Sequence, residues 1–146
     1  HIRRGDFKIG NQTTQLEFFI KVIVLIRQTV NEDLPVKVFT DAHQSELNEL
    51  LRMPNIFIAE NKPDILDILL LSKSKIMVLS KSSTFGYWAA FLSNALGIRP
   101  HYAWQELIKR EEGKYKEIKW NSENNENDNS LVDYMRENFS YQDAKN

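Results

Sequence analysis

Two adjacent arginines, Arg3 and Arg4, stand near the start of the sequence in HIRRGDFKIG. A guanidinium group offers paired donors in a fixed fork, which suits the oxygens of a phosphate group. The net charge of the chain is −1 at pH 7, so the pair does not belong to a generally basic protein that would attract nucleic acid. We expect the two arginines to bind an anion. A solvated or salt-bridged surface pair is the plainer interpretation.

A second signal for an anion lies in LSKSSTFG, residues 79–86, where Ser82, Ser83 and Thr84 precede a segment of helical character. Their hydroxyl groups and backbone amides would stand at a helix N-terminus, where the helix dipole favours negative charge. The same residues would also make an ordinary helix cap. Asp41, in FTDAH, is likewise either a site residue or a cap. Two separate loops therefore predict one anionic ligand, most simply a diphosphate.

The elements that must position these loops alternate along the chain. The pattern of apolar residues predicts helices at 13–30, 43–52, 63–74 and 82–96, and strands at 35–41, 55–60, 75–80 and 98–103. HIRRG would be the exposed end of one more strand, ahead of the first helix. This alternation predicts an α/β fold, a Rossmann-like parallel sheet flanked by helices. In such sheets ligands bind where strands end, so the three loops should converge on one edge.

Several residues carry signals for helix ends. Thr14 and Glu17 fit a capping box at the start of the first helix. Gly97 would end the fourth helix, because glycine is the usual residue just past a helix C-terminus. A last short helix is expected to be capped by Ser130, with Asp133 three residues later.

The alternation weakens beyond Trp104, which suggests a division of the chain. We expect residues 1–104 to form the ligand-binding domain and residues 105–146 to form an extension. The extension would hold a polar low-complexity loop at 121–130 and the short terminal helix. A sequence that opens at His1 is expected to be a fragment, with a further domain ahead of it.

Composition excludes several classes of protein. The 146 residues are about one domain, and 42% hydrophobic with 27% charged residues is ordinary for a globular chain. Cysteine is absent, so disulfides and cysteine zinc sites are excluded. The longest apolar run, FFIKVIVLI, holds a lysine and is far shorter than the roughly 20 residues that span a bilayer. The histidines stand apart, so we expect no metal site. The motif GxGxxG does not occur, which argues against a nicotinamide or flavin dinucleotide-binding domain. The motif GxSxG of the hydrolase nucleophile elbow is also missing.

Three segments together resemble a known family. HIRRGDF resembles the HxRRxD motif of the fucosyltransferase superfamily, most closely the bacterial and animal α-1,2-fucosyltransferases. STFGYWAAFL resembles the later motif STFSWWxAWL, and VFTDAH resembles the FSDD segment, in the same order and over residues 1 to about 103. Two departures stand out. Ala42 replaces the second acid of FSDD, and Gly86-Tyr87 replaces Ser-Trp. We expect Tyr87 and Trp88 to pack in the core.

The resemblance implies a GT-B glycosyltransferase of two Rossmann-like domains, of which this chain would be the C-terminal, donor-binding half. The donor would be GDP-fucose and the acceptor a glycan, with inverting transfer, no metal and no cofactor. The missing half would precede this chain and bind the acceptor. We expect the isolated chain to bind the donor weakly and to catalyse little.

The resemblance also assigns roles to single residues. Arg3 would be the catalytic group, gripping the donor β-phosphate, with Arg4 in support. His1 and Asp67 would lie near the guanine, although Asp67 could equally be a solvent-facing helix residue. The phosphates and fucose would be contacted by Ser82, Ser83, Thr84 and Phe85. The two arginines would be oriented by Asp6 and Asp41.

Other interpretations stay open at this point. The chain could belong to another GT-B enzyme with a different nucleotide sugar, or to a non-catalytic nucleotide-binding module. Acceptor, linkage, general base and oligomeric state are not encoded in these motifs. The absence of cysteine and of an anchor fits a bacterial cytoplasmic enzyme of polysaccharide synthesis, free or peripheral to the inner membrane. A Golgi enzyme lacking its membrane stem would look the same.

Overall fold

The computed structural model describes residues 1–5, 13–60, 62–103, 115–121 and 129–139. Helices and strands alternate along most of this part, as predicted. The elements are α1 (Leu16–Val30), β1 (Val36–Val38), η2 (Gln44–Leu47), α2 (Asn48–Leu51), β2 (Ile56–Ile58), α3 (Asp64–Ser72), β3 (Ile76–Val78), α4 (Thr84–Leu92), β4 (Leu96–Pro100), β5 (Lys116–Trp120) and α5 (Ser130–Asn138). All described strand pairs are parallel.

The strands form two small parallel sheets, β1–β2 and β3–β4–β5. The first residues of the chain lie between them. The Ile2 nitrogen donates to the Phe39 carbonyl at the end of β1 (2.9 Å), and the Ser80 nitrogen, past the end of β3, donates to the His1 carbonyl (3.2 Å). If this segment is counted as the first strand, the spatial order becomes 3-2-1-4-5-6, the order of doubly wound sheets. The α/β prediction is confirmed, and the arrangement is compatible with a Rossmann-like fold.

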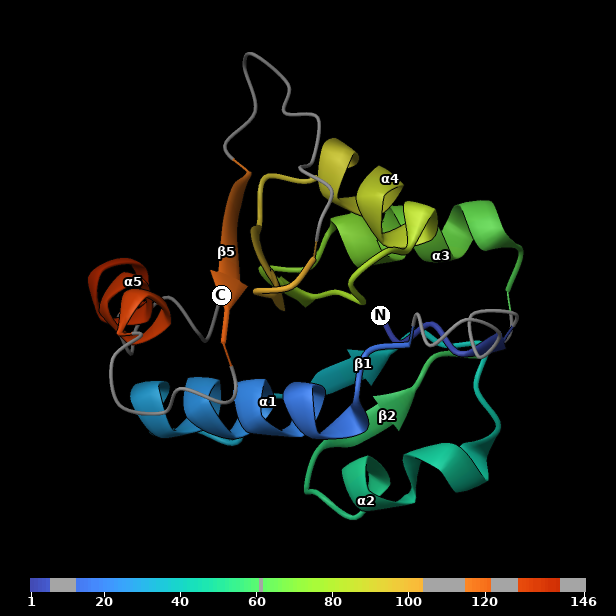
Figure 1. Cartoon of the computed structure of the whole chain (residues 1–146), viewed down its shortest axis with the longest axis horizontal. Coiled ribbons are helices and arrows are strands. Elements are labelled where there is room, and N and C mark those ends of the chain that lie inside the picture. Colours follow the sequence, from blue (N-terminus) through green and yellow to red (C-terminus); the bar gives the residue numbers. More distant parts are fainter. Residues whose placement is uncertain (6–12, 61, 104–114, 122–128, 140–146) are drawn as a thin grey trace.

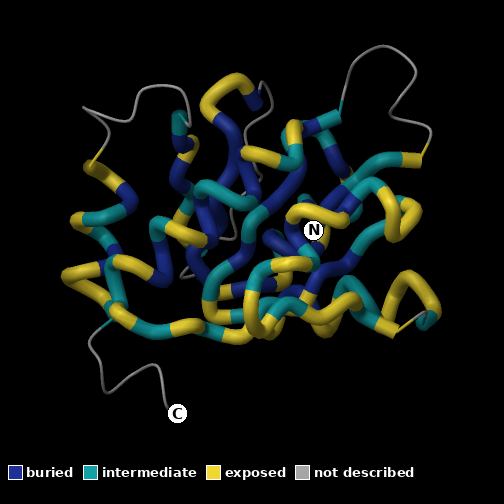
Figure 2. Tube along the Cα trace, turned by 90° about the horizontal axis from the view of Figure 1, so that it is seen from below, coloured by how far each residue is buried: buried dark blue, intermediate teal, exposed yellow. Residues whose placement is uncertain are grey.

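Helices cover the strands on two sides. Figure 1 shows α3 and α4 on one side and α1 with α2 on the other, with α5 beside α1. The buried side chains divide in the same way, into one cluster that contains α1, α2 and α5 residues and a second that contains α3 and α4 residues. Buried stretches run through the interior of the trace, and exposed residues lie mostly along its outside (Figure 2).

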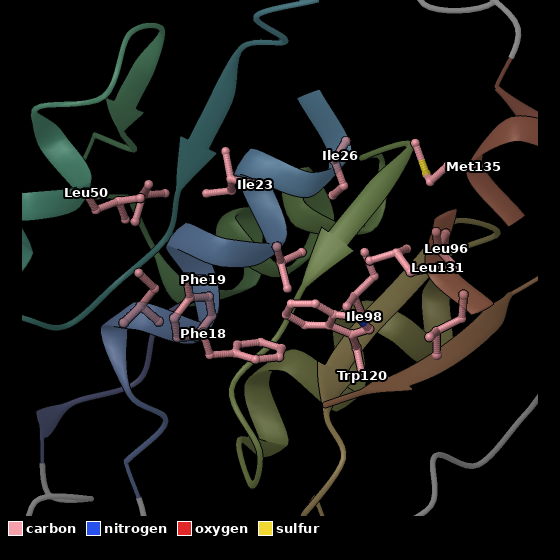
Figure 3. Close-up of a cluster of buried hydrophobic side chains, with 14 of the residues drawn as sticks. Phe18, Phe19, Ile23, Ile26, Leu50, Leu96, Ile98, Trp120, Leu131 and Met135 are labelled. Carbon is pink, nitrogen blue, oxygen red and sulfur yellow. The ribbon is translucent and has the colours of Figure 1, made fainter. Parts of the chain in front are cut away.

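The larger cluster is organised by α1. Phe18, Phe19, Val22, Ile23 and Ile26 are buried, at the spacing of one helical face. The labelled side chains in Figure 3 show this face meeting residues of β4, β5 and α5. Residues after position 104 therefore contribute to the same core as the residues before it, through Ile118, Trp120, Leu131 and Met135.

The predicted capping box at the start of α1 is wrong. The helix begins at Leu16, and its N-cap, Gln15, makes no side-chain capping bond. Thr14 is instead fully buried, and its Oγ1 accepts a hydrogen bond from the Lys81 nitrogen at 2.9 Å. A long-range contact to another loop has displaced the local cap.

Two further end signals were misplaced. Gly97 does not end α4, which stops at Leu92. It lies inside β4, where a Cβ would overlap the Tyr115 side chain. A close approach of side chain to backbone, and not a helix end, therefore requires glycine here. Ser130 is the first residue of α5 rather than its cap, because the N-cap is Asn129.

The strand β5 was not predicted. It lies parallel to β4 with Ile118 opposite Ile98, at the open edge of the three-stranded sheet. Its last three residues alternate: Ile118 and Trp120 are buried, and Lys119 between them is exposed. The predicted last strand at 98–103 corresponds to β4, which starts two residues earlier.

Candidate functional site

Three loops meet at the point where the strand order reverses. The first-strand segment has β1 on one side and β3 on the other, so the chain after each of these strands opens on the same edge. The Arg3 nitrogen donates to Ser80 Oγ at 2.9 Å, and the Arg4 nitrogen donates to Asp41 Oδ1 at 2.7 Å. The structure therefore brings together three loops, as the sequence predicted: the arginine loop (residues 3–5), the aspartate loop (residues 39–43) and the serine loop (residues 79–84).

Asp41 holds the arginine loop by charge. Its Oδ2 lies 2.8 Å from Arg3 Nη1, and the two side chains are 30% and 33% exposed. Its other oxygen accepts from the Arg4 backbone, so both carboxylate oxygens are used. A Cβ at Gly5 would overlap the same carboxylate, so a larger residue here would displace the Asp41 side chain. The predicted orienting role of Asp41 agrees with this geometry.

Thr40 ties the loop after β1 to the first strand. Its Oγ1 donates to the Ile2 carbonyl at 2.7 Å and accepts from the Ala42 nitrogen at 3.0 Å. One hydroxyl thus satisfies a backbone acceptor and a backbone donor that the strand ends leave open. Ala42 contributes only its backbone nitrogen to this network.

The serine loop is held by neutral groups from three directions. Ser80 Oγ donates to the His1 carbonyl at 3.2 Å, and the Lys81 nitrogen donates to Thr14. The Tyr87 hydroxyl donates to the Lys81 carbonyl at 3.3 Å. These bonds fix the backbone immediately before α4, where the amides of a helix N-terminus point outward.

The three predicted serine-loop residues have different surroundings. Ser83 is the N-cap of α4, almost fully buried, and its Oγ accepts from the Gly86 nitrogen at 3.4 Å. The cap interpretation of Ser83 is therefore confirmed. Ser82 Oγ is buried with no hydrogen-bond partner among the described residues, and Thr84 is exposed on the first turn. Ser82 and Thr84 are the two hydroxyls here that are not engaged in the cap.

Two of the predicted base-binding residues lie at this edge. The His1 ring stacks on Phe85 at the start of α4, with ring centroids 4.8 Å apart and planes 13° apart. Asp67 lies in the first turn of α3, which follows β2 and so begins on the same edge of the sheet. Within the described ranges, no hydrogen bond or ion pair joins Asp67 to the arginine loop.

Some of the buried polar atoms without a hydrogen bond belong to predicted site residues, and others, such as Glu32 Oε2 and the Tyr115 hydroxyl, belong to residues that were not assigned to the site. Within the described part of the chain, His1 Nδ1, Asp67 Oδ1 and Ser82 Oγ are buried without a hydrogen-bond partner. Such atoms are rare in folded proteins, because each one loses its hydrogen bonds to water without replacement. All three belong to side chains that the sequence assigned to ligand binding. Asp6, the remaining predicted residue, lies outside the described residues.

Tyr87 and Trp88 were expected to pack in the core, and neither is fully buried. Tyr87 is half-buried, and the Arg99 guanidinium lies 4.8 Å from the centre of its ring. Trp88 does not pack in the core: it is 59% exposed on α4. The helix turns its Ala89 and Ala90 side toward the sheet, which leaves Trp88 on the outer face.

Sequence reasoning missed four residues that build the site. Thr14, Thr40, Ser80 and Tyr87 all hold loop backbone through hydroxyl groups. Position gave a weak signal for Thr40 and Ser80, which follow strands. Nothing local marks Thr14, since its partner lies 67 positions away.

Comparisons with protein-family models, curated proteins and solved structures found no match to this chain. In the described ranges, no three His, Cys, Asp or Glu side chains gather as a metal site would require. No described helix combines the length and the apolar character needed to cross a bilayer.

Proposed function

We propose that this chain is the donor-binding half of a GT-B glycosyltransferase that transfers fucose from GDP-fucose to a glycan acceptor, as an α-1,2-fucosyltransferase. The observation that carries the proposal is the meeting of Arg3, Asp41 and the loop before α4 at the reversal of strand order. Nucleotide ligands bind at this position in doubly wound sheets. The motif resemblance supplies the identity of the donor.

The charges of the site support a diphosphate. Arg3 provides a cation about a third exposed, and the N-terminus of the nine-residue helix α4 provides backbone amides and a positive dipole end. Ser82 Oγ adds a hydroxyl with no partner in the described part of the chain. An anion bridging the two loops would satisfy all three groups at once.

The base and sugar would occupy the two flanks of this anion site. The stacked pair of His1 and Phe85 offers an aromatic and polar wall. Asp67 offers a carboxylate that could accept from the guanine N1–H and amino group, which uracil and adenine do not present in the same arrangement. We therefore propose selectivity for GDP over UDP and ADP.

In the proposed mechanism, the chain stabilises the leaving group. Negative charge grows on the diphosphate as the fucosyl–phosphate bond breaks, and the acceptor oxygen attacks from the opposite face with inversion. Arg3 and the amides before α4 are held in advance by Asp41, Thr14 and Tyr87, so they need little reorganisation. A fixed cation and a helix N-terminus can provide this stabilisation, which is why we propose transfer without a metal.

The acceptor hydroxyl must lose a proton, and we propose that the other half of the enzyme handles this step. The acceptor-binding domain would precede this chain, and the general base would come from it or from the acceptor loop. The isolated chain is then expected to bind the donor weakly and to transfer little.

Calorimetric titration of the 146-residue chain with GDP, UDP, ADP and pyrophosphate tests the proposal. We expect micromolar to millimolar binding of GDP and weaker binding of the others. Equal binding of all four would support a diphosphate site without base recognition, as in another nucleotide-sugar transferase. No binding by a folded chain would count against the donor site. Turnover by an enzyme carrying both halves separates a transferase from a non-catalytic module.

A further inference from the structure

A fully buried arginine lies in β4, one strand away from the serine loop. The side chain of Arg99 is 0% exposed. Leu96 and Ile98 of the same strand belong to the cluster around α1. Because successive side chains of a strand point to opposite faces, Arg99 points to the other face, where it meets Tyr87 of α4. Arginine is almost never fully buried, so this position needs a physical explanation.

A carboxylate of the neighbouring strand β5 holds Arg99 in place. Arg99 Nη2 lies 3.2 Å from Glu117 Oε1, and the Glu117 side chain is only 11% exposed. Tyr115 is packed over Gly97 on the same face of the sheet. Burial raises the pKa of the Tyr115 hydroxyl, and the charge of Glu117 raises it further, so this tyrosine stays neutral beside the ion pair.

Stability does not account for the pair of Arg99 and Glu117. Burying two charges costs much of the energy that their attraction returns, and apolar side chains of similar volume often replace such a pair without loss. What the pair does provide is a guanidinium plane in one fixed orientation. The feature to explain is therefore what that plane supports.

The Arg99 guanidinium supports the ring of Tyr87. Its Cζ lies 4.8 Å from the ring centre, within the range of a cation–π contact. The hydroxyl at the far end of the ring donates to the Lys81 carbonyl at 3.3 Å. The position of the ring, and with it the hydroxyl that reaches the serine loop, thus depends on the arginine below it.

The Lys81 carbonyl sets the direction of the amide that follows it. The carbonyl and the Ser82 N–H belong to one planar trans peptide unit, so they point in opposite directions. The bond from Tyr87 therefore turns the Ser82 N–H away from Tyr87. The preceding peptide unit is fixed as well, because the Lys81 nitrogen donates to Thr14 Oγ1 at 2.9 Å. The Ser82 amide consequently has a defined direction before any ligand binds.

We propose that Arg99 is a positioning residue for the anion site, acting through the Tyr87 ring and the Lys81 carbonyl to aim the Ser82 amide at a phosphate oxygen. Glu117 acts one step further back, by orienting the guanidinium. An amide aimed in advance stabilises negative charge without reorganisation when the ligand arrives. The inference rests on the proposed function in one respect, that the ligand at this edge carries a diphosphate.

The test removes the buried charge pair and measures pyrophosphate binding to the 146-residue chain by calorimetry. Arg99→Met alone would leave the Glu117 carboxylate buried without this cation, so it is combined with Glu117→Gln. We expect the dissociation constant to rise about tenfold, the effect of one hydrogen bond to a charged group. Tyr87→Phe removes only the hydroxyl and should cause a similar loss. Because the three residues act in one series, combining all three substitutions should add nothing.

A spectroscopic measurement separates positioning from stability. In ¹H–¹⁵N spectra of the ligand-free chain, the Ser82 amide resonance should move in the same direction in Tyr87→Phe and in the charge-pair variant. Arg27→Met is the matched control, because Arg27 is also buried but donates to the Leu34 and Pro54 carbonyls from the end of α1. It should lower stability while leaving the Ser82 resonance and pyrophosphate affinity unchanged.

A further variant covers the case in which the charge-pair variant does not fold. Arg99→Lys keeps a cation beside Glu117 but has no planar group to stack on Tyr87, so it should lose affinity and move the Ser82 resonance in the same way. Wild-type affinity and an unmoved resonance in Arg99→Lys would overturn the proposal.

Two other results would also overturn it, and they differ in what they say of the proposed function. If the wild-type chain binds pyrophosphate but the losses from Tyr87→Phe and the charge-pair variant add fully, Arg99 does not act through Tyr87 and the anion site stands. If the folded wild-type chain binds no pyrophosphate, the anion site itself is wrong, and the proposed function fails together with the role of Arg99.

Discussion

The two loops that flank the candidate site are held by opposite means. The arginine loop is held by charge, through a carboxylate that engages both the Arg3 guanidinium and the Arg4 backbone near the surface. The serine loop is held by neutral hydroxyls and backbone groups, around the fully buried Thr14 and the nearly buried Ser83.

This difference separates the ability to bind an anion from the rigidity of the site. An exposed ion pair contributes little to stability and weakens in salt, so the fold depends little on the charges of the arginine loop. Buried hydrogen bonds are costly to leave unmade, so the serine loop keeps its shape whether or not a ligand is present. Substitutions in the two loops should therefore affect different measurements.

Arg3→Ala is expected to have the largest effect, and to have it on binding. A hydrogen bond to a charged group contributes about 1.5–3 kcal/mol, so the dissociation constant for GDP should rise about 10- to 100-fold. Calorimetry measures this, with Arg52→Ala on the exposed surface after α2 as the matched control. Equal GDP affinity in the two variants would remove Arg3 from the site.

Thr14→Val should break the serine loop. Valine keeps the shape of threonine but leaves the Lys81 nitrogen without its acceptor, at a cost of about 1–3 kcal/mol in the free energy of unfolding. Urea denaturation measures the loss. Thr29→Val, inside the helix α1 that follows Thr14, is the control, since it removes only a side-chain bond to the Leu25 carbonyl. A loss no larger than that of Thr29→Val would show that the buried contact is not needed.

Ser82 and Ser83 sharpen the comparison within one loop. Ser83→Ala removes the cap of α4 and should lower the free energy of unfolding by about 1 kcal/mol. Ser82→Ala should change stability by less than about 0.5 kcal/mol, because its Oγ has no partner among the described residues, but it should weaken GDP binding. Urea denaturation and calorimetry on both variants separate the roles. The reverse pattern would contradict them.

Asp41→Asn should have only a small effect on stability. Asparagine can still accept from the Arg4 nitrogen and loses only the exposed ion pair, which contributes about 0.2–1 kcal/mol. Glu17→Gln, which breaks the exposed pair with Lys21, should cost a similar amount. Both losses should shrink in concentrated salt when unfolding is followed in urea. A much larger, salt-insensitive loss for Asp41→Asn would show that the arginine loop is held like the serine loop.

Periodicity predicted most of the fold. The apolar face of α1 and the continuous apolar run of β3 each depend on local sequence, so the alternation of elements followed from patterns of this kind. β5 was not predicted, because KEIKW is a short edge strand with three charged residues. Its pairing with β4 joins residues that are too far apart in the sequence for a local pattern to reveal. The helix ends were least predictable, since at Thr14 and Gly97 a tertiary contact determined the residue type.

The candidate site was predictable in its charged and capping residues, but not in the hydroxyl groups that hold its loops. Arg3, Asp41 and Ser83 were visible because charged and capping residues after strands are few. The hydroxyls of Thr14 and Tyr87 were not, because threonine and tyrosine serve equally well in packing, and only the folded chain brings them to Lys81. The stack of His1 on Phe85 likewise joins residues from two distant segments.

The bond between the Arg3 nitrogen and Ser80 joins positions 77 apart, and the bond between Arg4 and Asp41 joins positions 37 apart. Closing such long loops is slow, because the entropy is lost before the contacts form. The arginine edge should thus be among the last parts of the chain to assemble during folding. As synthesis proceeds, the arginines emerge before β3 and must wait for it before they have a place to dock.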